Sequence, residues 1–175
     1  EYEELHKSNR QHEKKAGFIG IRAIDKIKKE ILEETQEILS IANAPHPNVA
    51  TIKKYLKEAS KEFEVPFSIL DAIAKTYNNY CMIGPSEYGA YGIMGLINNE
   101  NNTNLNLSAE LIHVDVEEVK SNPRQNIRAA AALLAYYGKK IKDPSQIIEW
   151  FDAVKDFTGL NDDFTKEMQA IDYYK

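Results

Sequence analysis

The strongest constraint on the fold is the spacing of apolar residues, which follows a helical repeat along most of the 175-residue chain. Between Phe18 and Ala44 the apolar residues recur at intervals of three, four or seven: Ile21, Ile24, Ile27, Ile31, Ile38, Ile41 and Ala42. Lys and Glu residues separate them, so this segment is predicted to be one long amphipathic helix with a charged outer face. Patterns typical of β-hairpins are nearly absent, and the spacing therefore predicts an all-α fold.

Proline and asparagine residues mark where the first helices end and begin. The sequence Pro45-His46-Pro47-Asn48 stops the long helix and supplies an N-cap for a second helix over 49–63. Pro66 then opens a third helix over 67–77. These breaks predict short connections and no long flexible linker in this part of the chain.

Further helix starts follow in the second half of the chain. Each one pairs an N-cap side chain with Glu or Gln three residues later, in Asp115–Glu118, Asn122–Gln125 and Asp143–Gln146. The helix over 123–139 is rich in alanine and leucine, so we expect it to be central, and a last helix covers 164–174. The subdivision that the sequence indicates is an N-terminal helical arm, 1–47, and a helical domain, 48–175.

The segment over 78–106 differs from the rest because it is rich in residues that break helices. It contains Gly84, Pro85, Gly89, Gly92, Gly95 and a cluster of asparagines. In a helical protein, a long irregular segment of this kind is frequently where a functional site lies. We therefore expect a loop-rich groove here.

The distribution of charge argues against a nucleic-acid partner. Residues 1–64 carry 12 basic and 12 acidic side chains, whereas residues 65–175 carry 10 basic and 15 acidic ones. A phosphate backbone is bound by clustered Lys and Arg, and the net acidity of the second part does not provide them. The sequence contains no run of 18 apolar residues, so no membrane span is predicted. Its start, Glu1-Tyr2-Glu3-Glu4, does not resemble an export signal.

Metal and cofactor motifs are not found in the sequence. The histidines His6, His12, His46 and His113 are not spaced to place two imidazoles on one helical face, and the single Cys81 cannot form an intrachain disulfide. Glycine-rich phosphate loops, dinucleotide fingerprints and nucleophile elbows are also missing. We therefore expect neither a bound metal nor a cofactor.

Two stretches carry a specific resemblance to a known family. They are Ile69–Asn78 followed by Gly84–Leu96, which contains Gly-Ala-Tyr-Gly-Ile-Met, and Asn122–Leu134, which contains Asn-Pro-Arg-Gln-Asn-Ile. Together they resemble the lysozyme-like domain of lytic transglycosylases, which combines a helix ending in Glu-Ser, a Gly-Ala-x-Gly-[Leu/Ile]-Met-Gln-Leu loop and an [Asp/Asn]-Pro-x-x-Asn-Ile helix. The resemblance covers about residues 65–174.

A variant of this family is more similar still. Pro85-Ser86 ahead of the Gly-Ala-Tyr-Gly motif, and the tail Glu149–Gly159, resemble the domain that precedes the zinc amidase module in some bacterial N-acetylmuramoyl-L-alanine amidases. This similarity implies an exported protein of the cell envelope, either periplasmic or extracellular. We do not expect this chain to bind that module's zinc, because its histidines and its cysteine cannot supply the module's ligands.

The residue at the family's catalytic position is the main departure. Counting from either the start of the 67–77 helix or from Gly89 places Tyr77 where the resemblance expects the catalytic Glu, and Asn78 where it expects Ser. Glycoside cleavage requires a carboxylic acid that protonates the leaving oxygen, and a tyrosine with a pKa near 10 holds its proton too tightly. The family's Gln is Gly95, its glycine after Asn-Ile is Ala130, and its helix tyrosine is Leu133.

The resemblance also implies the residues of a glycan-binding groove: Tyr77, Asn78, Tyr88, Tyr91, Gly92, Ile93, Met94 and Asn126. Tyr80, Tyr88 and Tyr91 could stack on sugar rings or pack in the groove wall. Ile93 and Met94 are better suited to the core, and Asn126 to a buried position that braces the loop. Glu87 is a weak candidate for the missing acid and Glu100 a second one, although solvated loop charges are the simpler interpretation of both.

Three functional hypotheses follow. The first is a catalytically degenerate lysozyme-like domain that binds or positions on peptidoglycan, as glycan strand or muropeptide, in association with an amidase domain. The second is an active muramidase or lytic transglycosylase that uses a non-standard carboxylate such as Glu87. The third is a non-catalytic helical module that binds another protein. In each case the apolar face of the arm has to be buried against this domain or a partner.

Overall fold

The computed structural model describes residues 24, 26–33, 35–36 and 47–175. The chain divides into two units, Glu1–Leu39 and Ser40–Lys175. In the first unit the described residues are helical, in agreement with the predicted amphipathic helix, and Ile24, Ile27 and Ile31 are exposed. The remainder of the helix predicted over 18–44 lies outside the described residues.

The second unit is mostly helical, which confirms the general prediction of fold class. Its helices are α2 (Val49–Phe63), α3 (Phe67–Asn78), α4 (Asn104–Leu111), α5 (Val116–Ser121), α6 (Pro123–Tyr137), α7 (Phe151–Phe157) and α8 (Asp163–Tyr173), with 3₁₀ turns η1 (Gly138–Lys140) and η2 (Ile147–Trp150). A small antiparallel hairpin pairs β1 (Ala90–Tyr91) with β2 (Leu96–Ile97). The strictly all-α prediction is therefore corrected, because each strand is only two residues long and leaves no period-2 pattern to detect.

The helix starts show where capping motifs predict structure and where they do not. The side chain of Asp115 accepts a hydrogen bond from the Glu117 N–H at 2.8 Å, and that of Asn122 accepts one from the Arg124 N–H at 3.0 Å, as predicted. The helix start predicted at Asp143 was wrong. Its carboxylate binds both the N–H and the hydroxyl of Ser145, which forms a side-chain turn, and the next helical residues begin at Ile147.

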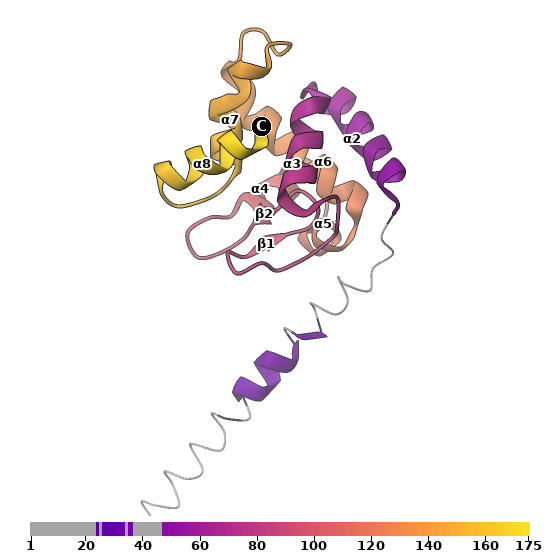
Figure 1. Ribbon diagram of the computed structural model, residues 1–175. Coiled ribbons are helices and arrows are strands. Elements are labelled where there is room, and N and C mark those ends of the chain that lie inside the picture. The colour runs from indigo at the N-terminus through magenta and orange to yellow at the C-terminus, as the bar shows by residue number, and fades with distance from the viewer. Residues whose placement is uncertain (1–23, 25, 34, 37–46) are drawn as a thin grey trace, which may run out of the picture. The chain divides into compact units, whose positions relative to one another are not determined.

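Helix α6 is the centre of the domain, as its composition predicted. It packs against α2, α4, α5 and α7, and in Figure 1 it passes behind α3 through the middle of the fold. Its buried side chains are mostly small: Asn126, Ile127, Ala129, Ala130, Ala131, Ala132, Leu133 and Leu134. Alanine at these positions lets the neighbouring helices approach closely, so α6 can be covered on several sides at once.

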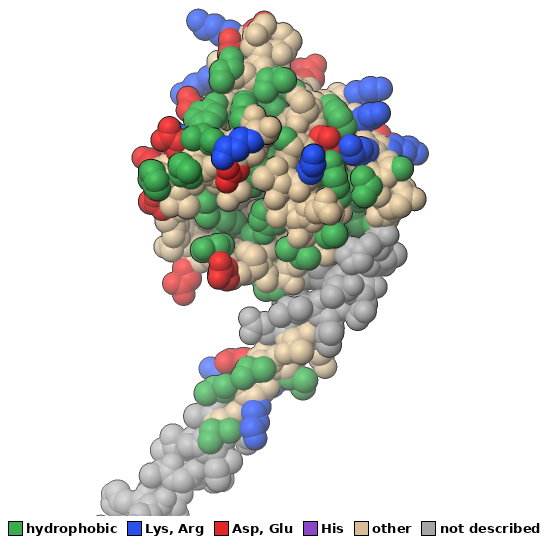
Figure 2. Space-filling model, viewed as in Figure 1, with side chains coloured by type: hydrophobic (Ala, Val, Ile, Leu, Met, Phe, Trp, Pro, Cys, Tyr) green, Lys and Arg blue, Asp and Glu red, His purple; other side chains and the backbone are tan. Residues whose placement is uncertain are grey.

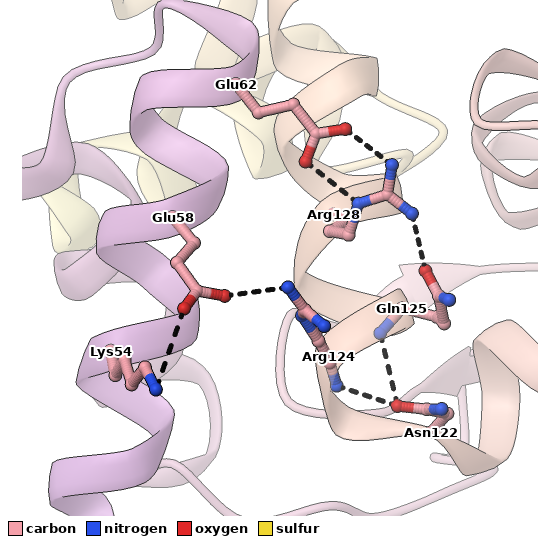
Figure 3. Close-up of polar contacts among 7 residues, drawn as sticks. All are labelled: Lys54, Glu58, Glu62, Asn122, Arg124, Gln125 and Arg128. Atoms are coloured by element: carbon pink, nitrogen blue, oxygen red, sulfur yellow. Dashed lines mark hydrogen bonds and ion pairs between the residues drawn. The ribbon is translucent and has the colours of Figure 1, made fainter.

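Two ion pairs connect α6 to α2 along one side of the core. Figure 3 shows Arg128 and Arg124 of α6 reaching Glu62 and Glu58 of α2. The Arg128 guanidinium contacts both Glu62 oxygens, with Nε donating to Oε2 at 2.9 Å, and its Nη1 donates to the Gln125 side chain at 2.8 Å. The Arg128 guanidinium holds the pKa of the Glu62 carboxyl below its ordinary value.

We expect Glu62→Gln to lower the free energy of unfolding by about 0.5–1 kcal/mol at neutral pH, because it replaces a two-point ion pair at the surface with a neutral contact. The lowered pKa means that this contribution is present above the unfolded-state pKa of about 4.3 and is lost as the pH falls through the folded-state value. Urea denaturation of both proteins across this pH range measures it. Glu58→Gln removes one hydrogen bond from Arg124 at 3.1 Å and a longer ion pair with Lys54 at 4.0 Å, so it should cost less, and an equal effect of both changes would contradict the argument.

Candidate functional site

A cavity of about 360 Å³ opens between the end of α3, the β1–β2 hairpin and the connection from α7 to α8. Its first wall comes from the loop-rich segment and α3, and its second wall from the last 20 residues of the chain. The lining residues are Tyr77, Ser86, Tyr88, Ala90, Gly95, Ile97, Phe157, Thr158, Leu160, Asn161, Asp162, Thr165, Gln169 and Tyr173. The loop-rich segment, where a groove was predicted, contributes Ser86, Tyr88, Ala90, Gly95 and Ile97 to this lining.

Tyr77 lies in the last turn of α3 and presents its ring to the hairpin. A Cβ atom at position 95 would lie 2.7–2.8 Å from three atoms of the Tyr77 ring, and Gly95 has φ +65°. Glycine is therefore required at position 95 both by the backbone conformation and by the tyrosine above it. The tyrosine ring occupies the volume that a side chain at position 95 would need.

The Tyr77 hydroxyl is buried and has no hydrogen-bond partner of standard geometry among the described residues. Burial raises the pKa of the phenol, and the nearby Ser86 hydroxyl offsets part of this rise. Buried polar groups are nearly always paired, so an unpaired hydroxyl in a cavity wall is a natural contact for a polar atom of a ligand or for water. The phenol is neutral in this role, because its pKa lies above the ordinary value of about 10.

Asn126 holds the hairpin loop in place from the first turns of α6. Its Oδ1 accepts a hydrogen bond from the Met94 N–H at 3.0 Å, and its Nδ2 donates to the Tyr91 carbonyl at 3.3 Å and the Val119 carbonyl at 3.2 Å. The side chain is fully buried. A Cβ atom at Gly92, which has φ +79°, would overlap the Asn126 amide. Asn126 is therefore a positioning residue, as one of the two interpretations of the sequence predicted.

Of the eight residues predicted to form the groove, only Tyr77 and Tyr88 line the cavity. Ile93 and Met94 are buried in the core, and Gly92 is buried against Asn126. Asn78 donates from Nδ2 to the Cys81 carbonyl at 2.7 Å. The ring of Tyr91 packs against Gly84 and lies 4.6 Å from the Lys120 ammonium, away from the cavity lining.

The carboxylates that could replace a catalytic acid are not placed for that role. Glu87 and Glu100 are exposed loop residues, and neither contributes to the cavity lining. The acid that does line it, Asp162, accepts the Thr165 N–H at 2.8 Å as the N-cap of α8, and this contact lowers its pKa. A lowered pKa keeps Asp162 ionised at neutral pH, which is the opposite of what a general acid needs.

The second wall was missed by sequence reasoning. Thr165, Gln169 and Tyr173 are four residues apart and share the face of α8 that lines the cavity. Burial raises the pKa of the Tyr173 phenol, so this side chain also stays neutral. The signal was present as a helical period in the 164–174 segment, but a polar stripe on a terminal helix is usually a solvated face.

Comparison with known proteins finds no matching family model, no matching curated protein and no matching solved structure. Within the described part of the chain, no group of three or more His, Cys, Asp or Glu side chains could hold a metal ion. No described helix is both long enough and apolar enough to cross a bilayer. The functional argument therefore depends on the sequence motifs and on the chemistry of the cavity.

Proposed function

We propose that residues 48–175 are a lysozyme-like domain that binds the glycan strand of peptidoglycan in the cavity beside Tyr77 without cleaving it. The observation that carries this proposal is the position of Tyr77. The motifs place it where the resembled family has its catalytic acid, and Tyr77 is one of the residues that line the cavity, with its hydroxyl buried and unpaired. The domain would thus retain the ability to bind glycan and lack the catalytic acid.

The cavity chemistry supports binding in preference to cleavage. A phenol whose pKa is raised above 10 cannot protonate a glycosidic oxygen efficiently at neutral pH. Changes at Tyr77 and Gly95 are also mutually dependent, because the ring fills the space above the glycine. Restoring an acid at position 77 would remove the packing that now closes this part of the wall.

The composition of the lining suits a neutral saccharide. The lining residues supply phenol, hydroxyl and amide groups and one carboxylate, that of Asp162, beside the apolar side chains of Ile97, Phe157 and Leu160, and include no Lys, Arg or His. A glycan offers hydroxyl and acetamido groups with an apolar C–H face, whereas the peptide of a muropeptide carries carboxylates that would find no cation here. We therefore favour the glycan strand over the peptide, with Tyr88, which is 61% exposed, stacking on a sugar ring.

The cellular context follows from the same proposal. A peptidoglycan-binding domain functions outside the cytoplasmic membrane, so the protein is proposed to be exported to the cell envelope. The similarity of Pro85-Ser86 and Glu149–Gly159 to amidase-associated domains supports a role in positioning a cell-wall amidase. In that role, glycan binding would raise the local concentration of the amidase on its substrate.

Retention on purified, insoluble peptidoglycan tests the proposal. The full chain should be retained, and Tyr88→Ala should weaken retention about threefold to tenfold through loss of stacking. Tyr77→Phe removes only the hydroxyl, and it should also weaken retention because the proposed contact between that hydroxyl and the glycan is lost. Tyr136→Ala is the matched control, since this exposed tyrosine on α6 lies outside the cavity. Failure of the wild-type chain to be retained at low salt would reject the proposal.

A turbidity assay on the same cell walls separates binding from cleavage. We expect neither the wild-type chain nor Glu87→Gln to reduce turbidity, because no lining carboxyl is held in its protonated form. Sustained lysis that is abolished by Glu87→Gln would instead support the active-enzyme hypothesis.

A further inference from the structure

Helix α8 carries apolar side chains on two opposite faces. Its inner face buries Ala170 and Tyr173 in the domain. On the other side Phe164, Met168 and Ile171 are 74%, 44% and 36% exposed. Their spacing of four and then three residues places them in one stripe, which we call the outer face of α8. A helix that is apolar on both faces is expected to be covered on both.

The outer face of α8 leads to an apolar pocket at the C-terminal end of the helix. This pocket has a volume of about 260 Å³ and is lined by Ser68, Ile69, Ala72, Ile147, Tyr173, Tyr174 and Lys175. Ile171 lies one helical turn before Tyr174 and Lys175, so the stripe and the pocket are adjacent. From Phe164 to Lys175 a helix rises about 16 Å, enough to contact three turns of another helix.

Acidic side chains border the outer face of α8 on both sides. At 100° per residue, Asp163 and Glu167 fall on one side of the stripe and Asp172 on the other. Residues 162–175 contain four acidic and two basic side chains, a net charge of −2. The two lysines are paired with aspartates of α8, Lys166 with Asp163 at 4.0 Å and Lys175, just after the helix, with Asp172 at 2.7 Å. Figure 2 shows hydrophobic and acidic side chains together over α8.

This charge pattern decides between possible occupants. In an antiparallel pairing of two copies, the same flank of each helix meets the other, so Glu167 and Asp163 would face acidic residues and repel them. An anionic membrane surface would be repelled for the same reason. A helix with Lys or Arg beside an apolar stripe complements both the apolar residues and the acidic borders.

We propose that the outer face of α8 and the adjoining pocket bind a cationic amphipathic helix of another protein. Apolar side chains of that helix would cover Phe164, Met168 and Ile171, and one of them would enter the pocket beside Ile147. Its basic residues would lie against Glu167 and Asp172. The stripe of Phe164, Met168 and Ile171 does not line the glycan cavity, and the adjoining pocket shares only Tyr173 with it.

Two synthetic helices test the proposal against the full chain. Both have leucines in one stripe, and the flanking residues are lysine in one and glutamate in the other. By fluorescence anisotropy we expect the lysine peptide to bind more tightly than the glutamate peptide, and its affinity to fall as salt is raised. Met168→Asp should lower the affinity for the lysine peptide at least tenfold, whereas Val49→Asp, at an exposed apolar site on α2, should leave that affinity unchanged.

Charge reversal supplies the sharpest test. Combining Glu167→Lys with Asp172→Lys should shift the preference to the glutamate peptide, while retention on peptidoglycan remains unchanged. All these residues are exposed, and circular dichroism confirms folding of each variant. Equal binding of the two peptides, equal losses from Met168→Asp and Val49→Asp, or self-association in sedimentation velocity that Met168→Asp abolishes would each overturn the proposal.

Discussion

Replacing Asn126 by leucine should lower the free energy of unfolding by at least about 3 kcal/mol, although the two side chains have similar shapes. The amide pairs with three backbone groups: the Met94 N–H and the carbonyls of Tyr91 and Val119. Leucine leaves all three without this partner in a fully buried site, and each such group costs roughly 1–3 kcal/mol. The loss is a large share of the 5–15 kcal/mol by which a typical domain is stable.

Urea denaturation monitored by circular dichroism measures the effect. Asn122→Leu is the matched control, because it removes an asparagine from the same helix at a less buried position. Because Asn122 is the N-cap of α6, its replacement should lower the free energy of unfolding by only about 1 kcal/mol. We also expect Asn126→Leu to weaken peptidoglycan retention, since the hairpin that carries part of the cavity wall depends on it. Equal destabilisation by the two changes would show that the loop has another support.

The Asn-Pro-Arg-Gln-Asn-Ile motif shows what the sequence could predict. Local capping chemistry acts within a few residues, so the start of α6 at Pro123 followed from the Asn122 N-cap. The central position of α6 followed from its alanines, and both features depend on short-range rules or on composition, which a single sequence displays directly. A bracing role for Asn126 was expected only because its motif resembles the Asn-Ile helix of lytic transglycosylases.

The parts that the sequence did not predict depend on contacts between distant segments. The cavity combines Tyr77 with Tyr173, which are far apart in the chain, and no local pattern connects them. Tyr91 was expected in the groove, yet the turns around it direct its ring towards Gly84 and Lys120. Asp143 satisfies a capping pattern but closes a turn with Ser145, because the same side chain serves either structure.

Tyr77 and Gly95, two residues that differ from the pattern the sequence resembles, are physically coupled. A side chain larger than hydrogen at position 95 would meet the Tyr77 ring, and a smaller residue at position 77 would leave a void above Gly95. Each residue therefore favours the other. This dependence supports the proposed binding role, because placing an acid at position 77 would require a second change at position 95 to fill the space.

Gly92→Ala should be comparably destabilising, by at least about 3 kcal/mol. Gly92 has φ +79°, where an alanine is strained by roughly 1–2 kcal/mol. Its Cβ would also overlap the Asn126 amide and displace it from its hydrogen bonds with the hairpin. The change thus adds backbone strain to part of the loss expected for Asn126→Leu.

Gly159→Ala separates these two contributions. Gly159 has nearly the same backbone conformation, φ +66°, but its nearest neighbours would lie 3.1–3.2 Å from a Cβ atom. Its neighbours would need to shift by only a few tenths of an ångström, so most of its cost, about 1–2 kcal/mol, should come from backbone strain. In an Asn126→Ala background, Gly92→Ala should fall to a similar cost, because the overlapping amide is gone and the two effects are not additive. If Gly92→Ala costs the same with and without Asn126, the amide does not limit the residue at position 92, and the loop is held by its turn alone.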